Sequence, residues 1–218
     1  DGLLPGADRD LVKPLHKRVK GLFEAIRLNT KVVGLKDVGN GVEVSFEGPD
    51  GETTETFSRV LVAVGRRPNS DGIGLENTNV VIDPKGFVEV DKQQRTGDAH
   101  IFAIGDVCGE PMLAHRASHQ GKVAVESLHG EPAMFDPRAI PAVVFTDPEI
   151  AWAGLTEQEA ELSGREVEVS RYPWAASGRA HALGRIEGMT KILVDPETEQ
   201  VLGVGIVGSG AGELIAEG

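Results

Sequence analysis

A single carboxylate, that of Asp106, follows an apolar run that the sequence predicts to be a strand. The stretch HIFAIGDVCGEPMLAH covers residues 100–115, and its apolar run Ile101–Ile104 ends on Gly105 and Asp106. Ligands of open α/β sheets bind at the carboxyl ends of the strands. A carboxylate at this place can accept hydrogen bonds from the hydroxyls of a sugar or polyol. The alternative is that Asp106 only caps the next helix.

The following helix is predicted to begin near Leu113 and to end at His129. Its first amides, from Met112 to His115, lack carbonyl partners within the helix and carry the positive end of its dipole. Together with Asp106 they would hold a ligand with hydroxyls at one end and an electron-rich group at the other. A reduced flavin has this character, with ribityl hydroxyls for Asp106 and a pyrimidine edge for the amides.

The composition narrows the class of protein. The 218 residues are 40% hydrophobic and carry a net charge of −12, with no basic cluster beyond short pairs such as Arg66-Arg67. This balance argues against nucleic acid or an anionic membrane as a partner. No apolar run is long enough to span a membrane and no signal peptide is visible, so we expect a cytoplasmic protein. The single cysteine, Cys108, excludes an internal disulfide.

The first half of the chain reads as α/β. Asp8 is predicted to cap a helix from Arg9 towards Leu22, which Pro14 would kink or delay. Turn signals separate short strands, and the apolar run RVLVAVG at 59–65 is typical of a strand buried on both faces. The expected short strands are 30–36, 41–47 and 54–58.

The second half reads as α+β. The segment 130–141 contains three prolines and is predicted to be a linker. Alternating strands follow, with a hairpin turn at DPETEQ and one helix whose Thr156 and Glu159 form a capping box. The expected strands are 142–147, 150–154, 166–174, 189–195 and 201–208. Because the chain begins without methionine and stops within a helical pattern, we expect it to be part of a longer protein.

These motifs, taken in order, resemble the dihydrolipoamide dehydrogenases, a branch of the pyridine nucleotide–disulfide oxidoreductases. The wider family shares the AIGD element, whereas PMLAH resembles the lipoamide branch in particular. Similar segments occur along most of the chain: GADRDLV, VLVAVGRRPN, IPAVVFTDPEIAWAGLTEQEA, YPWAASGRA and GVGIVGSGAGELIAEG. The resemblance implies three domain portions. They are the end of a Rossmann-like NAD-binding domain at 1–68, a segment completing the FAD-binding domain at 69–135, and an α+β interface domain at 136–218.

The resemblance also implies cofactors, FAD and NAD, and the residues that bind them. Asp106 would accept the ribityl hydroxyls of FAD, and the flavin would be lined by Met112, Leu113, Ala114 and His115. Val32 and Gly65 match NAD contacts of the family, although Val32 could equally belong to a core and Gly65 to a turn. No metal site is implied. The family's redox cysteine pair and catalytic His-x-His-Pro motif are both absent from this sequence, so no catalytic residue is assigned, and Cys108 is interpreted as a small apolar filler.

The implied activity of the whole enzyme is reoxidation of dihydrolipoamide by NAD⁺, through an enzyme disulfide and FAD, with this fragment alone inactive. The implied partners are a second copy, bound through 136–218, and the lipoyl and subunit-binding domains of a 2-oxo-acid dehydrogenase acyltransferase. The glycine-cleavage complex is a further setting. Two alternatives stay open: another disulfide reductase of the family, such as a glutathione-type enzyme, and a non-catalytic dimerisation module.

Overall fold

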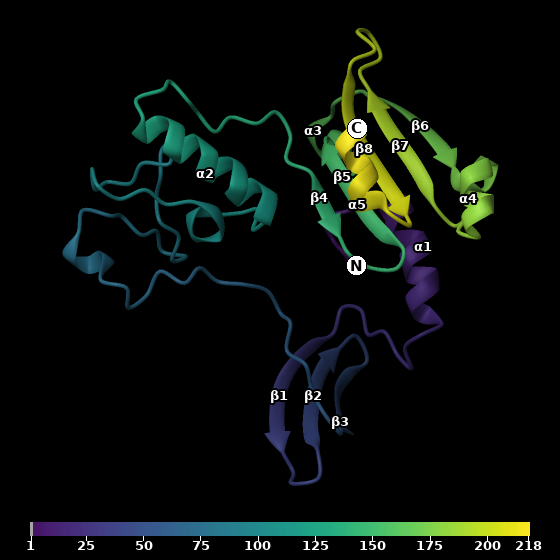
Figure 1. Ribbon diagram of the computed structural model, residues 1–218. Coiled ribbons are helices and arrows are strands. Elements are labelled where there is room, and N and C mark those ends of the chain that lie inside the picture. The colour runs from purple at the N-terminus through teal and green to yellow at the C-terminus, as the bar shows by residue number, and fades with distance from the viewer. Residues whose placement is uncertain (1) are drawn as a thin grey trace. The chain divides into compact units, whose positions relative to one another are not determined.

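The computed structural model describes residues 2–218, which divide into two compact units (Figure 1). One unit joins the chain up to Val62 with Pro141–Gly218, and the other is Ala63–Ile140. None of the described helices is long and apolar enough to cross a membrane. The predicted domain limits at 68/69 and 135/136 stay a prediction.

A five-stranded antiparallel sheet is the centre of the first unit, and it confirms the strands predicted for the second half. The strand order is β4-β5-β8-β7-β6. The DPETEQ turn joins β7 to β8, and the Asp195 carboxylate accepts hydrogen bonds from the amides of Glu197 and Thr198 at 3.1 and 3.0 Å. The strands are β4 (Ala142–Val144), β5 (Glu149–Gly154), β6 (Glu168–Pro173), β7 (Met189–Val194) and β8 (Val201–Gly208).

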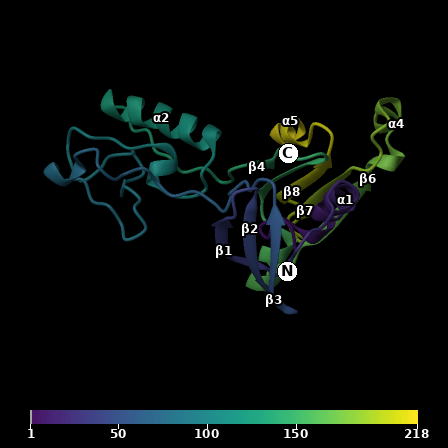
Figure 2. The same cartoon turned by 90° about the horizontal axis from the view of Figure 1, so that it is seen from below.

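The central strand β8 contributes residues to two apolar clusters, because its side chains alternate between the two faces of the sheet. Val207 packs in a cluster with residues of helix α1 (Arg9–Lys20), whereas Val204 and Ile206 pack in a cluster with helix α5 (Ala211–Leu214) and η4 (Ile215–Glu217). Figure 2 views this arrangement from below. The glycine at 205 lets α1 approach closely, since a Cβ there would lie 2.6 Å from the Leu11 Cδ1 atom.

Helix α1 begins at Arg9 and continues through Pro14, so the predicted late start is wrong. Asp8 occupies the predicted N-cap position of α1, but its side chain does not act as the cap. Its carboxylate makes no capping bond to α1, and instead accepts hydrogen bonds from the amides of Glu157 and Gln158 at 3.1 and 3.2 Å. These amides begin helix α3 (Glu157–Ser163), whose unpaired N–H groups attract an anion.

The predicted capping box at the start of α3 is confirmed by the reciprocal bonds between Thr156 and Glu159. A second helix, α4 (Gly178–Leu183), follows η3 (Trp174–Ala176) and was not predicted. Its N-cap is Ser177, whose hydroxyl accepts a hydrogen bond from the Ala180 amide at 3.4 Å. A helix this short that begins with glycine has only a weak helical signal in the sequence.

A buried ammonium joins three elements of this unit. Lys191 on β7 is fully buried, and its Nζ donates to Asp8, Asp10 and Glu157 at 2.6, 2.7 and 2.7 Å. Arg171 on β6 also pairs with Asp10 and Glu157. The three carboxylates have oxygens within 4.8 Å of one another. Because Lys191 donates to all three, the cluster already holds a cation of the protein.

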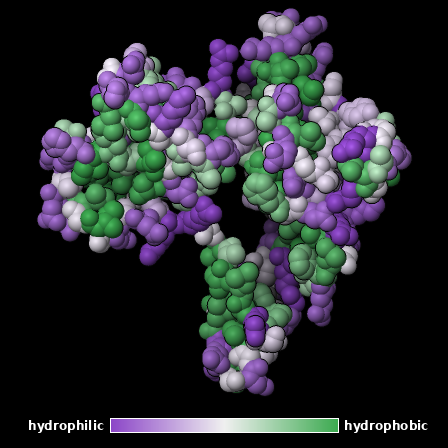
Figure 3. All heavy atoms as spheres, in the orientation of Figure 1, coloured by the Kyte–Doolittle hydropathy of each residue, from purple (hydrophilic) through white to green (hydrophobic). Residues whose placement is uncertain are grey.

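A separate three-stranded meander confirms the three short strands predicted at 30–36, 41–47 and 54–58. It consists of β1 (Lys31–Asp37), β2 (Val42–Gly48) and β3 (Gly51–Phe57) in antiparallel order β1-β2-β3. Val32, Val33 and Leu35 on β1 are about half exposed, and Figure 3 shows the apolar surface that results.

The strand predicted at 59–65 is not formed. This segment has no regular structure, and Leu61 and Val64 are both 91% exposed. A strand buried on both faces requires paired neighbours and covering helices, and the residues that the structure describes provide no strand that pairs with this segment. The predicted strand at Ile101–Ile104 is likewise reduced to one bridge, between Phe102 and Arg95.

Substitution of Gly203, on β8, tests how closely the backbone of Leu155 packs against the sheet. A Cβ at this position would lie 1.9 Å from the backbone oxygen of Leu155. We expect Gly203→Ala to lower the free energy of unfolding by about 2 kcal/mol, because backbone must move to admit the methyl group. Urea unfolding followed by tryptophan fluorescence measures this loss of stability. Gly178→Ala is the control, because no atom lies within 4 Å of the Cβ position at this residue. This variant should be no less stable than the unsubstituted protein.

Candidate functional site

The candidate site lies in the 63–140 unit, where η2 (Gly105–Cys108) meets α2 (Ala114–Leu128). The Gly105 amide donates a hydrogen bond of 2.8 Å to the buried Oε1 of Gln120 on α2. Gly105 has a φ of +76°, and a Cβ on it would lie 3.0 Å from the Cβ of Ala117. Glycine is therefore required for η2 to pack on the helix, and this packing positions Asp106.

The Asp106 carboxylate does not cap α2, so the alternative interpretation of this residue is wrong. The N-cap of α2 is Leu113, and no side chain caps the helix. The Oδ2 of Asp106 accepts a hydrogen bond of 3.0 Å from Arg66, and the side chain is 45% exposed. Within residues 2–218 no donor bonds to its Oδ1. One oxygen is thus oriented by an arginine and the other is available to a ligand hydroxyl.

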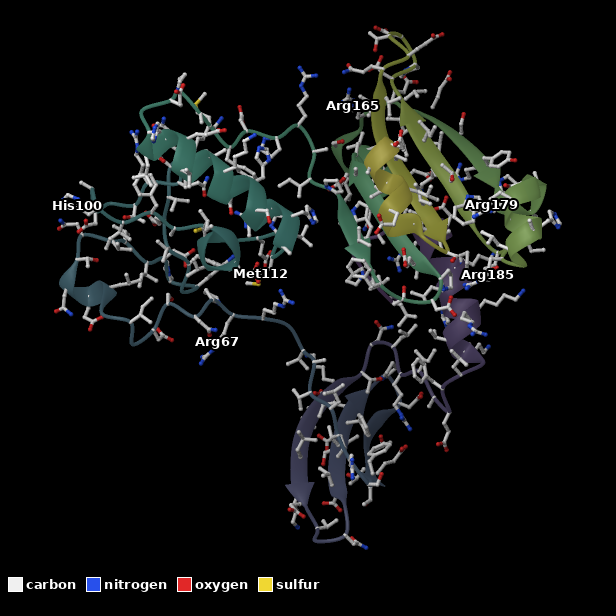
Figure 4. All side chains as sticks on the ribbon, viewed as in Figure 1. Arg67, His100, Met112, Arg165, Arg179 and Arg185 are labelled. Carbon is white, nitrogen blue, oxygen red and sulfur yellow. The ribbon has the colours of Figure 1, made fainter. Side chains whose placement is uncertain are left out.

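The N-terminal end of α2 supplies the complementary positive potential. Its first turn carries no acidic side chain, so nothing in that turn cancels the dipole of this 15-residue helix. Met112 and Leu113 are half-buried just before the helix, and Ala114 and His115 are exposed in its first turn. Figure 4 labels Met112 at this end of α2. The predicted flavin-lining residues therefore share one short segment.

The loop between η2 and α2 is held by a buried arginine. Arg116 is 8% exposed, and its Nη1 donates to the carbonyl oxygens of Gly109 and Pro111 at 2.5 and 3.2 Å. These two carbonyls lie between Asp106 and the first turn of α2 along the chain. The arginine consequently fixes the segment that connects the two halves of the site.

The half-buried thiol of Cys108 has a pKa that burial raises to about 11, against a smaller lowering by the charge of Arg116. Such a thiol is protonated at neutral pH and is a weak nucleophile. This pKa supports the interpretation of Cys108 as a packing residue rather than a redox centre.

The two predicted NAD contacts lie in different units. Val32 is on β1 in the first unit and is 56% exposed, which excludes a core position within the structure described. Gly65 lies in the 63–140 unit with a φ of +124° and no atom within 4 Å of its Cβ position. It immediately precedes Arg66, the partner of Asp106.

Three residues of the site were not predicted: Arg66, Arg116 and Gln120. A signal for two of them is present in the sequence. Arg116 and Gln120 are four residues apart, and they continue the helical stripe of the buried Val123, Ala124 and Ser127. Charged and amide side chains on the apolar face of a helix indicate buried polar contacts. Arg66 carries no comparable signal, because its contact is 40 residues away in the sequence.

The donor and acceptor set fits a flavin nucleotide. Asp106 presents a carboxylate oxygen for hydroxyls, and α2 presents amides without intrahelical partners to an electron-rich group. The loop held by Arg116 sets their spacing.

Comparisons with known proteins agree with this chemistry. Residues 1–121 match the sequence profile of the pyridine nucleotide-disulphide oxidoreductases, and residues 140–218 match the dimerisation domain of the same family. The chain is 47% identical over 218 residues to a dihydrolipoyl dehydrogenase of Vibrio cholerae and 46% identical over 217 residues to one of Haemophilus influenzae. Both alignments cover the whole of this chain but only 46% and 45% of the two relatives. The chain therefore spans about half the length of these relatives.

Solved structures show the same fold. LpdA from Mycobacterium tuberculosis has a TM-score of 0.89 at 29% identity, covering 100% of this chain and 47% of that one. The HOCl-induced flavoprotein disulfide reductase RclA from Escherichia coli has a TM-score of 0.89 at 27% identity, covering 100% of this chain and 49% of that one. Members of the family use FAD and NAD(H). The chain belongs to the pyridine nucleotide-disulphide oxidoreductases and includes their dimerisation domain.

Proposed function

We propose that the whole protein is a dihydrolipoyl dehydrogenase, which reoxidises dihydrolipoamide with NAD⁺ through an enzyme disulfide and FAD. The observation that carries the proposal is the Asp106 carboxylate, packed through η2 on a helix whose first turn has no acidic residue. The 47% identity to a dihydrolipoyl dehydrogenase over the full chain supports the choice of substrate.

FAD, when bound, supplies the two-electron chemistry. Asp106 would hold the hydroxyls of its ribityl chain, and the segment Met112–His115 would line the flavin, chiefly through backbone amides. Val32 and Gly65 would contact NAD. The disulfide and the catalytic histidine would come from parts of the protein outside this sequence, so the fragment alone is expected to be inactive.

The dimerisation domain supports a homodimer formed through residues 136–218. We propose that the assembled enzyme acts in the cytoplasm with lipoyl domains as substrates, bound to the acyltransferase of a 2-oxo-acid dehydrogenase complex or serving glycine cleavage. A second candidate is another flavoprotein disulfide reductase, because RclA shares the fold at a TM-score of 0.89.

The whole protein can be tested by its absorption spectrum and its substrate. We expect flavin absorption bands at about 450 nm and NAD⁺ reduction that depends on dihydrolipoamide. Flavin without this activity, but with NADH-dependent reduction of another disulfide such as glutathione disulfide, would favour the second candidate. A protein with neither flavin nor turnover would be a dimerisation module, which contradicts the proposal.

A further inference from the structure

Arg116 has a position that its packing alone does not explain. It is the third residue of α2 and is 8% exposed. Among residues 2–218, its side chain bonds to the backbone carbonyls of Gly109 and Pro111 and to no other group. No carboxylate forms an ion pair with it in the part of the chain that the structure describes. A buried cation without a counter-charge is costly, and buried charges are ordinarily paired.

The charge of Arg116 adds to a potential that is already positive. The helix dipole is positive at this end, and the first turn contains no acidic residue. The arginine also acts on the neighbouring Cys108, where its positive charge opposes the effect of burial on the thiol pKa. The end of α2 thus combines amides that have no acceptor within the helix with a guanidinium that has no carboxylate partner among the described residues. This arrangement stabilises an anionic or electron-rich group.

We propose that Arg116 is a positioning residue of the FAD site with a second, electrostatic effect. Its Nη1 holds the loop that joins Asp106 to α2, and its unpaired charge favours the reduced flavin over the oxidised one. This inference rests on the proposed function, since it requires that FAD bind at this end of α2. It goes further by assigning part of the redox equilibrium to one side chain.

The test uses the whole FAD-loaded protein and the variant Arg116→Gln, which removes the charge but keeps a donor for one carbonyl. We expect the reduction equilibrium of the flavin, measured by titration against a reference dye, to shift at least tenfold towards the oxidised form. This is about 30 mV for a two-electron couple. FAD should also dissociate at least tenfold faster, because the loop loses one of its two bonds.

Two further variants separate charge from packing. Arg116→Lys keeps the charge, so its equilibrium should stay within threefold of the unsubstituted protein. Lys122→Met removes a positive charge from an exposed position of the same helix, where the side chain is 74% exposed, and should change neither quantity. Should Arg116→Gln fail to fold, Arg116→Lys still tests the charge: a tenfold shift in its equilibrium would overturn the inference.

The inference also fails if Arg116→Gln binds FAD and shows the potential and dissociation rate of the unsubstituted protein. That result leaves the proposed function intact. An unsubstituted whole protein that takes up no FAD from solution would instead contradict the proposed function, and the inference with it.

Discussion

Replacing Lys191 with methionine is expected to lower the free energy of unfolding by about 3 kcal/mol. Removing one partner of a buried ion pair leaves uncompensated charge and typically costs about 3–5 kcal/mol. The low end applies because the side chains of Asp10 and Glu157 are 29% and 33% exposed, and water can screen them. Methionine fills much of the same space, so the effect comes from charge rather than from a cavity.

Urea unfolding followed by tryptophan fluorescence would measure this loss. Both tryptophans, Trp152 on β5 and Trp174 in η3, lie in the unit that contains Lys191. Arg18→Met in the same unit is the control and should change stability by less than about 0.5 kcal/mol, because its pair with Asp147 is on the surface. A loss below about 1 kcal/mol in Lys191→Met would show that the network contributes little.

The dependence of folding stability on alkaline pH gives a second test of the Lys191→Met substitution. Burial opposes the charge of Lys191, but hydrogen bonds to Asp10, Asp8 and Glu157 outweigh it and raise its pKa. A raised pKa stabilises the fold fully below the ordinary lysine value of about 10.4, and this contribution is lost as the pH rises through the folded value. The unsubstituted protein should therefore lose stability above about pH 10 more steeply than Lys191→Met.

Local signals in the sequence predicted much of the fold. The β1–β2 hairpin, the DPETEQ turn and the Thr156–Glu159 box each depend on residues a few positions apart, so turn and capping chemistry suffices to identify them. The strand predicted at 59–65 depends instead on neighbours in a sheet. The segment is apolar, as the prediction assumed, but within the described residues no strand pairs with it. Leu61 and Val64 are therefore exposed.

Long-range electrostatics accounts for the other differences. Asp8 has the residue type of an N-cap and the right position before α1, yet its carboxylate bonds to Lys191, 183 residues away, and to the start of α3. In the candidate site, Asp106 was predicted from its place after an apolar run. Its partner Arg66 was not, because a contact between distant residues leaves no periodic trace in one sequence.

Asp106→Ala is expected to raise the dissociation constant for FAD about 100-fold in the whole protein. Hydrogen bonds to a charged group contribute about 1.5–3 kcal/mol, which corresponds to roughly 10-fold to 150-fold in affinity. The loss should be at the upper end because the Oδ1 of Asp106 is open to a hydroxyl and its Oδ2 is oriented by Arg66. Fluorescence quenching of FAD added to the apoprotein would give the constant.

Two controls assign this loss to the carboxylate itself. Asp136→Ala removes an exposed aspartate of the same unit, paired with Lys92 at 2.9 Å, and should leave FAD affinity unchanged. Arg66→Gln removes the partner but keeps the Asp106 acceptor, so its effect should be smaller than that of Asp106→Ala. If Asp106→Ala binds FAD as tightly as the unsubstituted protein, the carboxylate holds no hydroxyl of the cofactor. The η2–α2 segment would then line the flavin through its amides alone.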